Sequence, residues 1–145
     1  GTTLAACLQT GLPNVGVTMD MGHALYVGEG TAWALSLLSQ AGRLFLVHVN
    51  DNYRNWDWDM IPGSVNTWDM VEMMFYLKKI NYQGWLTSDV APFRLDAAKT
   101  CSATFRSLIW AEKLVQKIGF ERLEQILAEG DAVDALDALQ KATLG

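Results

Sequence analysis

Cysteine is scarce in this sequence of 145 residues, and the two that occur, Cys7 and Cys101, lie far apart. Two cysteines cannot build a disulfide framework, and the sequence has no CxxC pair that would indicate a zinc or redox motif. Both fall in segments that we predict to be helical, so we expect two small, buried hydrophobic side chains. This usage is typical of a reducing compartment, and we expect a cytoplasmic protein.

Long hydrophobic runs are absent too, although half of the residues are hydrophobic. No apolar stretch approaches the roughly 20 residues that a helix needs to cross a bilayer. The first residues also lack the basic and apolar regions of a secretory signal. We therefore expect no membrane partner, and we expect one globular domain with a substantial core.

Basic residues are few, with 11 Lys and Arg against 16 Asp and Glu, and the formal net charge is −5. A chain of this charge repels polyanions unless bound cations reverse the local sign, so we expect no nucleic acid partner. The acidic excess is consistent with carboxylates that bind divalent cations, and equally with an ordinary surface.

Three apolar runs, each followed by acidic or imidazole side chains, are the most informative feature that is present. We predict strands over residues 15–21, 44–50 and 84–90, because these runs are short and strongly apolar. Helices over residues 31–40 and 67–80 separate them, and this spacing suits right-handed crossovers between parallel strands. These features predict an α/β fold with a parallel sheet.

One long loop interrupts the otherwise regular order of elements. Residues 51–64 are polar and aromatic, and a loop of this length is typical of a functional site. Thr67 is expected to cap the helix that follows. Further helices are predicted near the two ends of the sequence, over residues 2–10, 95–118, 120–128 and 132–142.

Both histidines of the chain follow predicted strands or lie near their ends, and acidic residues accompany them. Asp20 and His23 are three residues apart, so both side chains can reach the space above the end of the first strand. A carboxylate with an imidazole suits Mn²⁺, Co²⁺, Zn²⁺ or Mg²⁺ better than Ca²⁺. The alternative is that Asp20 caps a short helix and His23 hydrogen-bonds a backbone carbonyl.

The other candidate ligands belong to the second and third strands and to the long loop. His48 lies in a valine-rich strand, where a hydrogen-bonded core histidine is the alternative. Asp57 and Asp59 would point the same way in an extended loop and hold a cation, or else be solvated acids. Because active sites of α/β barrels form at the carboxyl ends of the strands, we predict a site for two divalent cations there. Its predicted ligands are Asp20, His23, His48, Asp57, Asp59 and Asp89.

Aromatic and amide side chains near these acids are candidates for substrate binding. Trp56 and Trp58 flank Asp57 and could stack on a sugar ring, with simple packing of the loop as the alternative. Asn50 is expected to hydrogen-bond substrate hydroxyls. Further polar residues that could contact substrate or orient the ligands are Asp51, Asn52, Arg54 and, more weakly, Arg94.

Taken together, the motifs resemble the C-terminal part of a xylose isomerase-like TIM barrel, and most closely L-rhamnose isomerase and related sugar isomerases. The resemblance covers about residues 14–110. It rests on DxxH at 20–23, HxND at 48–51, DxDxxxGS at 57–64 and Ser88-Asp89. It implies a partial (β/α)8 barrel of about strands six to eight within residues 1–118, followed by a C-terminal helical extension over residues 119–145.

The resemblance also implies a metal-dependent sugar isomerase that interconverts an aldose and a ketose by a hydride shift. Two divalent cations are implied, Mn²⁺ before Co²⁺, Mg²⁺ or Zn²⁺, and the catalytic one would bind a water that moves a proton between substrate oxygens. The six ligands would divide into Asp20, His48 and Asp89 for a structural metal and His23, Asp57 and Asp59 for the catalytic metal. A small sugar is the implied substrate, and the full-length protein is implied to be a homo-oligomer.

The sequence departs from the family pattern in what it omits. No residue matches the glutamate that bridges both metals, or the lysine near it, which belong to earlier strands. A full barrel also needs roughly 250 residues. The chain therefore resembles a fragment, which we expect to be inactive alone and to associate through two open strand edges and an uncovered inner face.

Other functions on the same barrel are open alternatives at this point. They are a sugar 3-epimerase, an inosose dehydratase, an AP endonuclease-like enzyme acting on abasic DNA, and a non-catalytic half-barrel that only binds metal. Epimerases of this type carry a glutamate on the last strand, so Asp89 and the DxD pair favour an isomerase. The acidic charge disfavours DNA as a substrate.

Overall fold

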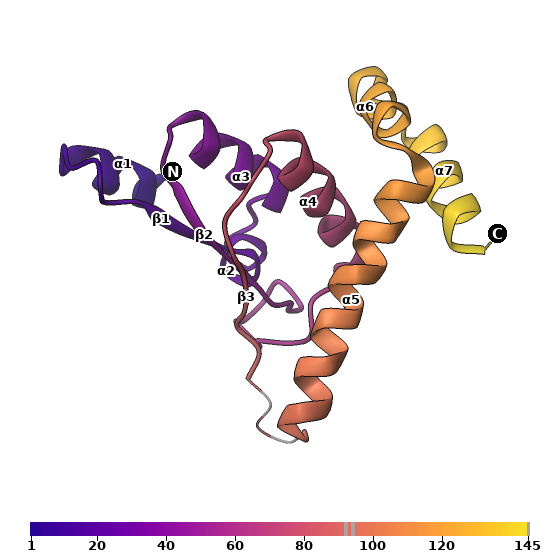
Figure 1. Cartoon of the computed structure of the whole chain (residues 1–145), viewed down its shortest axis with the longest axis horizontal. Helices are drawn as coiled ribbons and strands as arrows, with labels where there is room; N and C mark the ends of the chain where they lie inside the picture. Colours follow the sequence, from indigo (N-terminus) through magenta and orange to yellow (C-terminus); the bar gives the residue numbers. More distant parts are fainter. Residues whose placement is uncertain (92, 94, 145) are drawn as a thin grey trace.

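A parallel three-stranded sheet lies at the centre of the computed structural model, which describes residues 1–91, 93 and 95–144. The strands are β1 (Val17–Asp20), β2 (Leu44–Val49) and β3 (Leu86–Ser88), and β2 lies between the other two (Figure 1). Both pairings are parallel, which confirms the predicted α/β class. Each strand is shorter than predicted, and β1 and β3 have a pairing partner on one side only within the described residues.

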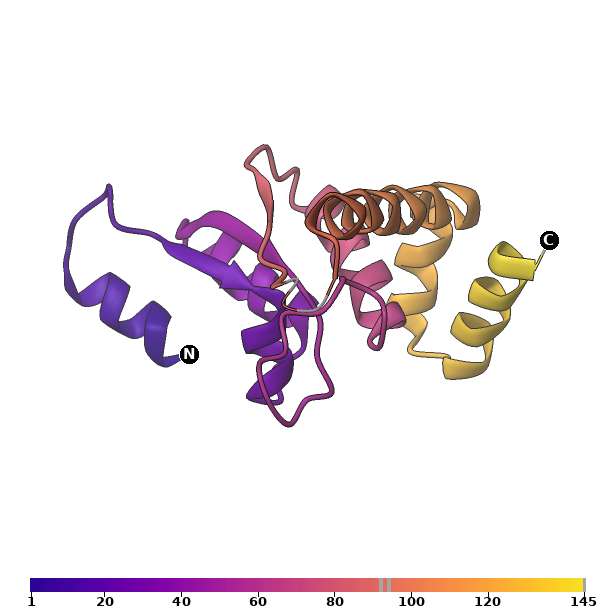
Figure 2. The ribbon, with the colours of Figure 1, turned by 90° about the horizontal axis from the view of Figure 1, so that it is seen from below.

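Helices follow each strand, as the predicted crossovers require. Figure 2 shows α1 at one end of the molecule, the sheet in the middle, and α6 and α7 at the other end. The long helix α5 packs on α4 and, through its C-terminal half, on α6 and α7. The helices of the described residues are α1 (Thr2–Gln9), α2 (Met21–Tyr26), α3 (Thr31–Gln40), α4 (Thr67–Lys79), α5 (Ala97–Ile118), α6 (Phe120–Glu129) and α7 (Ala132–Leu144).

The hydrophobic core lies between one face of the sheet and the helices that cover it. Val47 and Val49 of β2 are fully buried and belong to one apolar cluster with Leu35 of α3 and Phe75 of α4. Burying a side chain of this size stabilises the fold by about 1.5–3 kcal/mol relative to its exposure. The alternation of β2 therefore turns its valines toward the helices and leaves His48, between them, on the other face.

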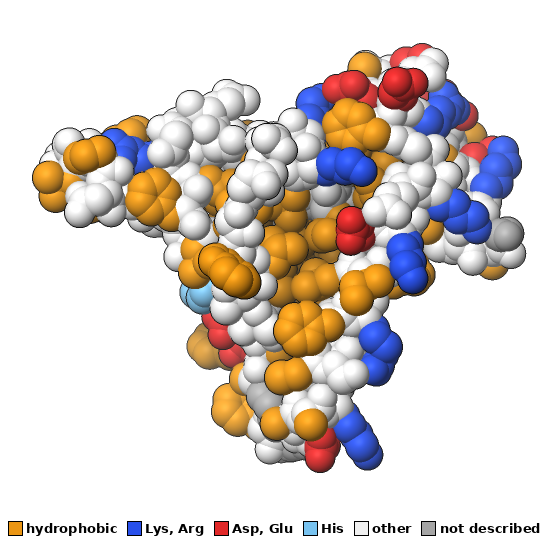
Figure 3. Space-filling view, viewed as in Figure 1, with side chains coloured by type: hydrophobic (Ala, Val, Ile, Leu, Met, Phe, Trp, Pro, Cys, Tyr) orange, Lys and Arg blue, Asp and Glu red, His pale blue; other side chains and the backbone are white. Residues whose placement is uncertain are grey.

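No layer of described residues covers that other face of the sheet. Thr18 and Thr87 are exposed on it, and the ring of Trp85, just before β3, is 81% exposed. Beside the free edge of β1 lies a hollow of about 630 Å³, and a hollow of about 340 Å³ lies between β3, α4 and α5. Figure 3 shows hydrophobic side chains lining the face between β3 and α5. This arrangement is that of a partial barrel, and the described strands do not close on themselves.

Two local predictions are wrong. Cys7 is buried as expected, but Cys101 is exposed, because it lies beside the buried stripe of α5 and not in it. Thr67 is the first helical residue of α4, and the N-cap is Asn66, which makes no side-chain cap hydrogen bond. The Asn66 side chain is instead engaged with the start of the long loop, by hydrogen bonds to Asp51 and to the Asn52 carbonyl.

Membrane insertion has no support in the helices of the described chain. In none of them do length and apolar character suffice for a helix that crosses a bilayer.

Candidate metal centre

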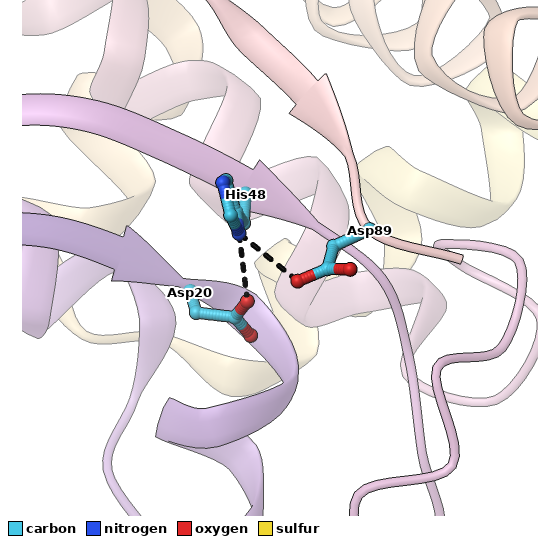
Figure 4. A group of neighbouring side chains, drawn as sticks. All are labelled: Asp20, His48 and Asp89. Carbon is cyan, nitrogen blue, oxygen red and sulfur yellow. Dashed lines mark hydrogen bonds and ion pairs between the residues drawn. The ribbon is translucent and has the colours of Figure 1, made fainter. Parts of the chain in front are cut away.

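Three side chains meet at the carboxyl ends of the three strands (Figure 4). The Nδ1 atom of His48 lies 3.4 Å from Oδ2 of Asp20 and 3.0 Å from Oδ2 of Asp89. One potential ligand atom from each residue lies within 4.8 Å of the other two, a spacing that a single cation can bridge. The sheet register explains the meeting, since it pairs Asp20 with His48 and hydrogen-bonds the Asp89 amide to the Val49 carbonyl. We refer to Asp20, His48 and Asp89 as the strand set.

Asp20 has two roles, one for each of its carboxylate oxygens. Oδ1 accepts a hydrogen bond from the His23 backbone N–H at 3.0 Å and so caps the short helix α2. Oδ2 faces His48. Asp20 can therefore cap α2 and lie beside His48 at the same time, because the cap uses one carboxylate oxygen and leaves the other free for a cation.

The remaining predicted ligands form a second cluster next to the first. Nε2 of His23, an exposed side chain in the first turn of α2, lies 2.9 Å from Oδ2 of Asp57. The other Asp57 oxygen, Oδ1, is buried and has no hydrogen-bond partner among the described residues. A buried carboxylate oxygen without a partner is costly, and a cation would satisfy it. We refer to His23, Asp57 and Asp59 as the loop set.

Asp59 lies among other negatively charged carboxylates. Burial raises the pKa of its carboxyl above the ordinary value, and the charges of Asp57 and Asp89 raise that pKa further. Asp20 acts in the same direction more weakly, while a hydrogen bond from Asn50 lowers the pKa. Four carboxylates thus repel one another across the two sets, and divalent cations would relieve this repulsion.

The loop that carries Asp57 and Asp59 does not have the extended shape assumed from the sequence. Asp59 has a left-handed backbone with φ of 46°, so the simple alternation of two side chains on one side does not apply. Its Oδ1 lies 3.4 Å from Nδ2 of Asn50. The two acids are brought close by this turn and by its contacts, and not by strand geometry.

Asn50, predicted to bind substrate, is fully buried, and its side chain faces other protein groups. Its Oδ1 accepts a hydrogen bond of 2.5 Å from the Gly22 N–H, and its Nδ2 faces Asp59. An added Cβ at Gly22 would lie 2.5 Å from that same Oδ1, so this position has no room for a side chain. Sequence reasoning missed the role of Gly22, and the only available signal was a glycine placed between two site residues.

The two tryptophans predicted to contact substrate are on the surface of the loop. Trp56 is 60% exposed and Trp58 is 51% exposed, and both rings are accessible for stacking. Trp56 makes an edge contact with Tyr26 of α2, and Trp58 donates a hydrogen bond to Asn55. Arg54 pairs with Asp69, 2.7 Å away, instead of facing the site. Arg94 lies outside the described residues.

The donors described above fit a divalent cation, because they combine carboxylate oxygens with imidazole nitrogens and leave one buried oxygen unsatisfied. A comparison with protein families adds an independent finding. A family model described as a xylose isomerase-like TIM barrel matches residues 2–107.

The chain belongs to this family. The match includes all three strands and every residue of the strand and loop sets, and it ends within α5. Xylose isomerase-like barrels form a broad group of sugar isomerases, epimerases and related enzymes. None of the curated proteins compared with the chain matches it.

Proposed function

We propose that this chain is the metal-binding part of a sugar isomerase of the L-rhamnose isomerase type, which interconverts an aldose and a ketose. The meeting of Asp20, His48 and Asp89 at the strand ends carries the proposal. The position of the loop set beside it supports a site for two cations, with Mn²⁺ as the first candidate. Four carboxylates would balance the charge of two divalent ions.

Each set has a separate task in this proposal. The strand set would hold one cation, and His23 with Asp57 and Asp59 would hold the other. Bound divalent cations polarise the carbonyl and hydroxyl oxygens of an open-chain sugar. The raised pKa of Asp59 in the metal-free chain reflects burial and repulsion by neighbouring carboxylates, and a cation bound by the loop set would relieve that repulsion.

The aromatic side chains of the loop would orient the sugar. Trp56 and Trp58 expose flat apolar faces of the kind that stack on sugar rings and exclude water. Their exposure in this chain is consistent with a surface that a ligand, or further parts of the barrel, would cover.

The remainder of the active site is proposed to come from additional barrel strands. β1 and β3 each have one unpaired edge among the described residues, and a hollow adjoins each of these edges. Strands that pair there would close the barrel, complete both metal shells and cover the open face. We propose that the complete enzyme is a homo-oligomer that acts on a small sugar.

Calorimetric titration with Mn²⁺ tests the metal site directly. The chain is expected to bind Mn²⁺, and His48→Ala and Asp89→Ala are expected to weaken binding by more than about 10-fold, since each removes a ligand. Asp137→Ala is the matched control, because it removes an exposed carboxylate of α7 far from the strand ends. Equal binding by the wild type and both site variants would contradict the proposal.

Activity assays separate the metal proposal from the half-barrel proposal. The chain alone is expected to show no aldose–ketose conversion in the presence of Mn²⁺. Turnover by the chain alone would contradict the half-barrel proposal and leave the metal site intact. In a complete enzyme, analysis of the product at C2 and C3 distinguishes isomerisation from 3-epimerisation.

A further inference from the structure

Asp51 is a fully buried carboxylate whose acceptor positions are all occupied. Its Oδ1 accepts hydrogen bonds from the Asn52 N–H at 2.8 Å and from Nδ2 of Asn66 at 2.6 Å. Its Oδ2 accepts from the N–H groups of Val65 at 2.8 Å and Asn66 at 3.0 Å. A carboxylate offers about four acceptor sites, so Asp51 has none left for a cation or a substrate.

The donors to Asp51 come from the far end of the loop, which closes the loop at its base. Residues 51–66 leave β2 at Asp51 and return to Val65 and Asn66 before α4 begins. The Met60 N–H also donates to the Asp51 carbonyl at 2.9 Å, which draws the middle of the loop to the same point. Asp57 and Asp59 lie on the segment confined in this way.

The two neighbours of Asp51 connect the loop to the start of α2. Asn50 accepts a hydrogen bond from the Gly22 N–H, and Asn52 donates one to the Gly22 carbonyl at 2.8 Å. Gly22 immediately precedes His23. Three consecutive residues after β2 thus hold both the helix turn that carries His23 and the loop that carries its acidic partners.

From this arrangement we infer that Asp51 is a positioning residue that sets Asp57 and Asp59 opposite His23 without touching a cation or a substrate. The strand set does not depend on it, because sheet register places Asp20, His48 and Asp89. Removal of the Asp51 charge should therefore impair the loop set selectively. The consequence for cation binding depends on the proposed function, whereas the consequence for the loop does not.

The chain has two histidines, one in each set, so histidine ¹⁵N NMR reports on each set separately. The test titrates Zn²⁺ into the wild type and into Asp51→Asn. For Asp51→Asn we expect the half-saturating Zn²⁺ concentration at His23 to rise about 10- to 100-fold, the usual effect of losing a group that orients ligands, and that at His48 to change less than about twofold. Asp96→Ala, which removes the side-chain cap of α5, controls for a general loss of stability. Equal weakening at both histidines, or no weakening, would overturn the inference.

Hydrogen exchange of the metal-free chain supplies a measurement that requires no cation. In Asp51→Asn the amides of Met60, Val65 and Asn66 are expected to exchange faster, while those of β2 remain protected. If Asp51→Asn fails to fold, Asn66→Ala takes its place. It removes only the hydrogen bonds that the Asn66 side chain donates to Asp51 and to the Asn52 carbonyl, so it should give the same pattern with a weaker effect. Unchanged exchange at these amides would overturn the role of Asp51. A wild-type His23 that does not respond to Zn²⁺ would instead contradict the second cation of the proposed function.

Discussion

The strand set and the loop set contain the same kinds of side chains but are built in different ways. Asp20, His48 and Asp89 are positioned by the hydrogen-bonded ladder of a parallel sheet, with one residue from each strand end. Asp57 and Asp59 belong to a loop that is shaped by buried side-chain hydrogen bonds. Backbone pairing fixes the first set rigidly, whereas the second depends on many separate polar contacts.

The two sets meet at Asp20, and its substitution should have the largest effect on cation binding. Asp20→Ala removes a strand-set ligand and also the cap of α2, so we expect Mn²⁺ binding to fall at both sets and stability to fall by about 1 kcal/mol. Asp20→Asn retains an oxygen that can cap the helix and should impair the strand set more than the loop set. Urea denaturation and Mn²⁺ calorimetry measure these effects. Asp20→Ala and Asp20→Asn both lack the charge, so equal stability of these two variants would contradict the capping role.

Gly22→Ala is expected to disturb the loop set through packing. The new Cβ would approach Oδ1 of the buried Asn50 to 2.5 Å, and relief of this overlap should cost about 1–3 kcal/mol. Gly30→Ala is the control, because its nearest neighbour, the Cβ of Trp33, would lie 3.8 Å away. Thermal and urea unfolding of both variants provide the measurement. A Gly22→Ala protein as stable as Gly30→Ala would show that Asn50 moves freely.

The smallest expected effect is the pH dependence that Asp59 contributes to the metal-free chain. Its pKa is raised in the folded state, so the native protein binds more protons there than the unfolded chain. Stability from this group is present at low pH and is lost as pH rises from the ordinary value of 3.8 through the raised folded pKa.

Asp59→Asn should abolish that loss, and the side-chain change is well tolerated by a left-handed backbone. Without metal the variant is therefore expected to be at least as stable as the wild type at pH 7, and with Mn²⁺ it should be stabilised less. Unfolding curves at several pH values, with and without Mn²⁺, test both expected changes in stability. A metal-free variant clearly less stable than the wild type would contradict the charge repulsion inferred here.

The fold and the strand set could be anticipated because both follow from periodicity. Apolar runs that end in Asp20, His48 and Asp89 predict strand ends, and parallel pairing brings such ends together. The predicted helix over residues 31–40 coincides with α3 for the same reason. The family match supports the partial barrel.

The loop set was harder to anticipate because tertiary hydrogen bonds determine it. No periodic pattern in the sequence indicates the left-handed turn at Asp59 or the burial of Asn50. The same is true of the hydrogen bonds that close the loop on Asp51. The Asn66 side chain, at the N-cap of α4, donates to Asp51 and makes no cap hydrogen bond, whereas the sequence predicted that Thr67 would cap this helix. Polar residues in loops are easily predicted to contact a ligand. Here Asn50, Asp51 and Asn52 instead hydrogen-bond the backbone of the segments that carry the candidate ligands.

The register that pairs Asp20 with His48 also limits how β1 can change in length. Side chains alternate between the two faces of a strand, so deletion of one residue between Val17 and Asp20 would turn the carboxylate inward among the helices and turn a hydrophobic side chain toward the site. Substitutions in β1 alter the core by degrees, but an insertion or deletion there exchanges the two faces at once. The number of residues in β1 thus decides whether the Asp20 carboxylate reaches the metal site, and for that placement it matters more than which apolar side chains the strand carries.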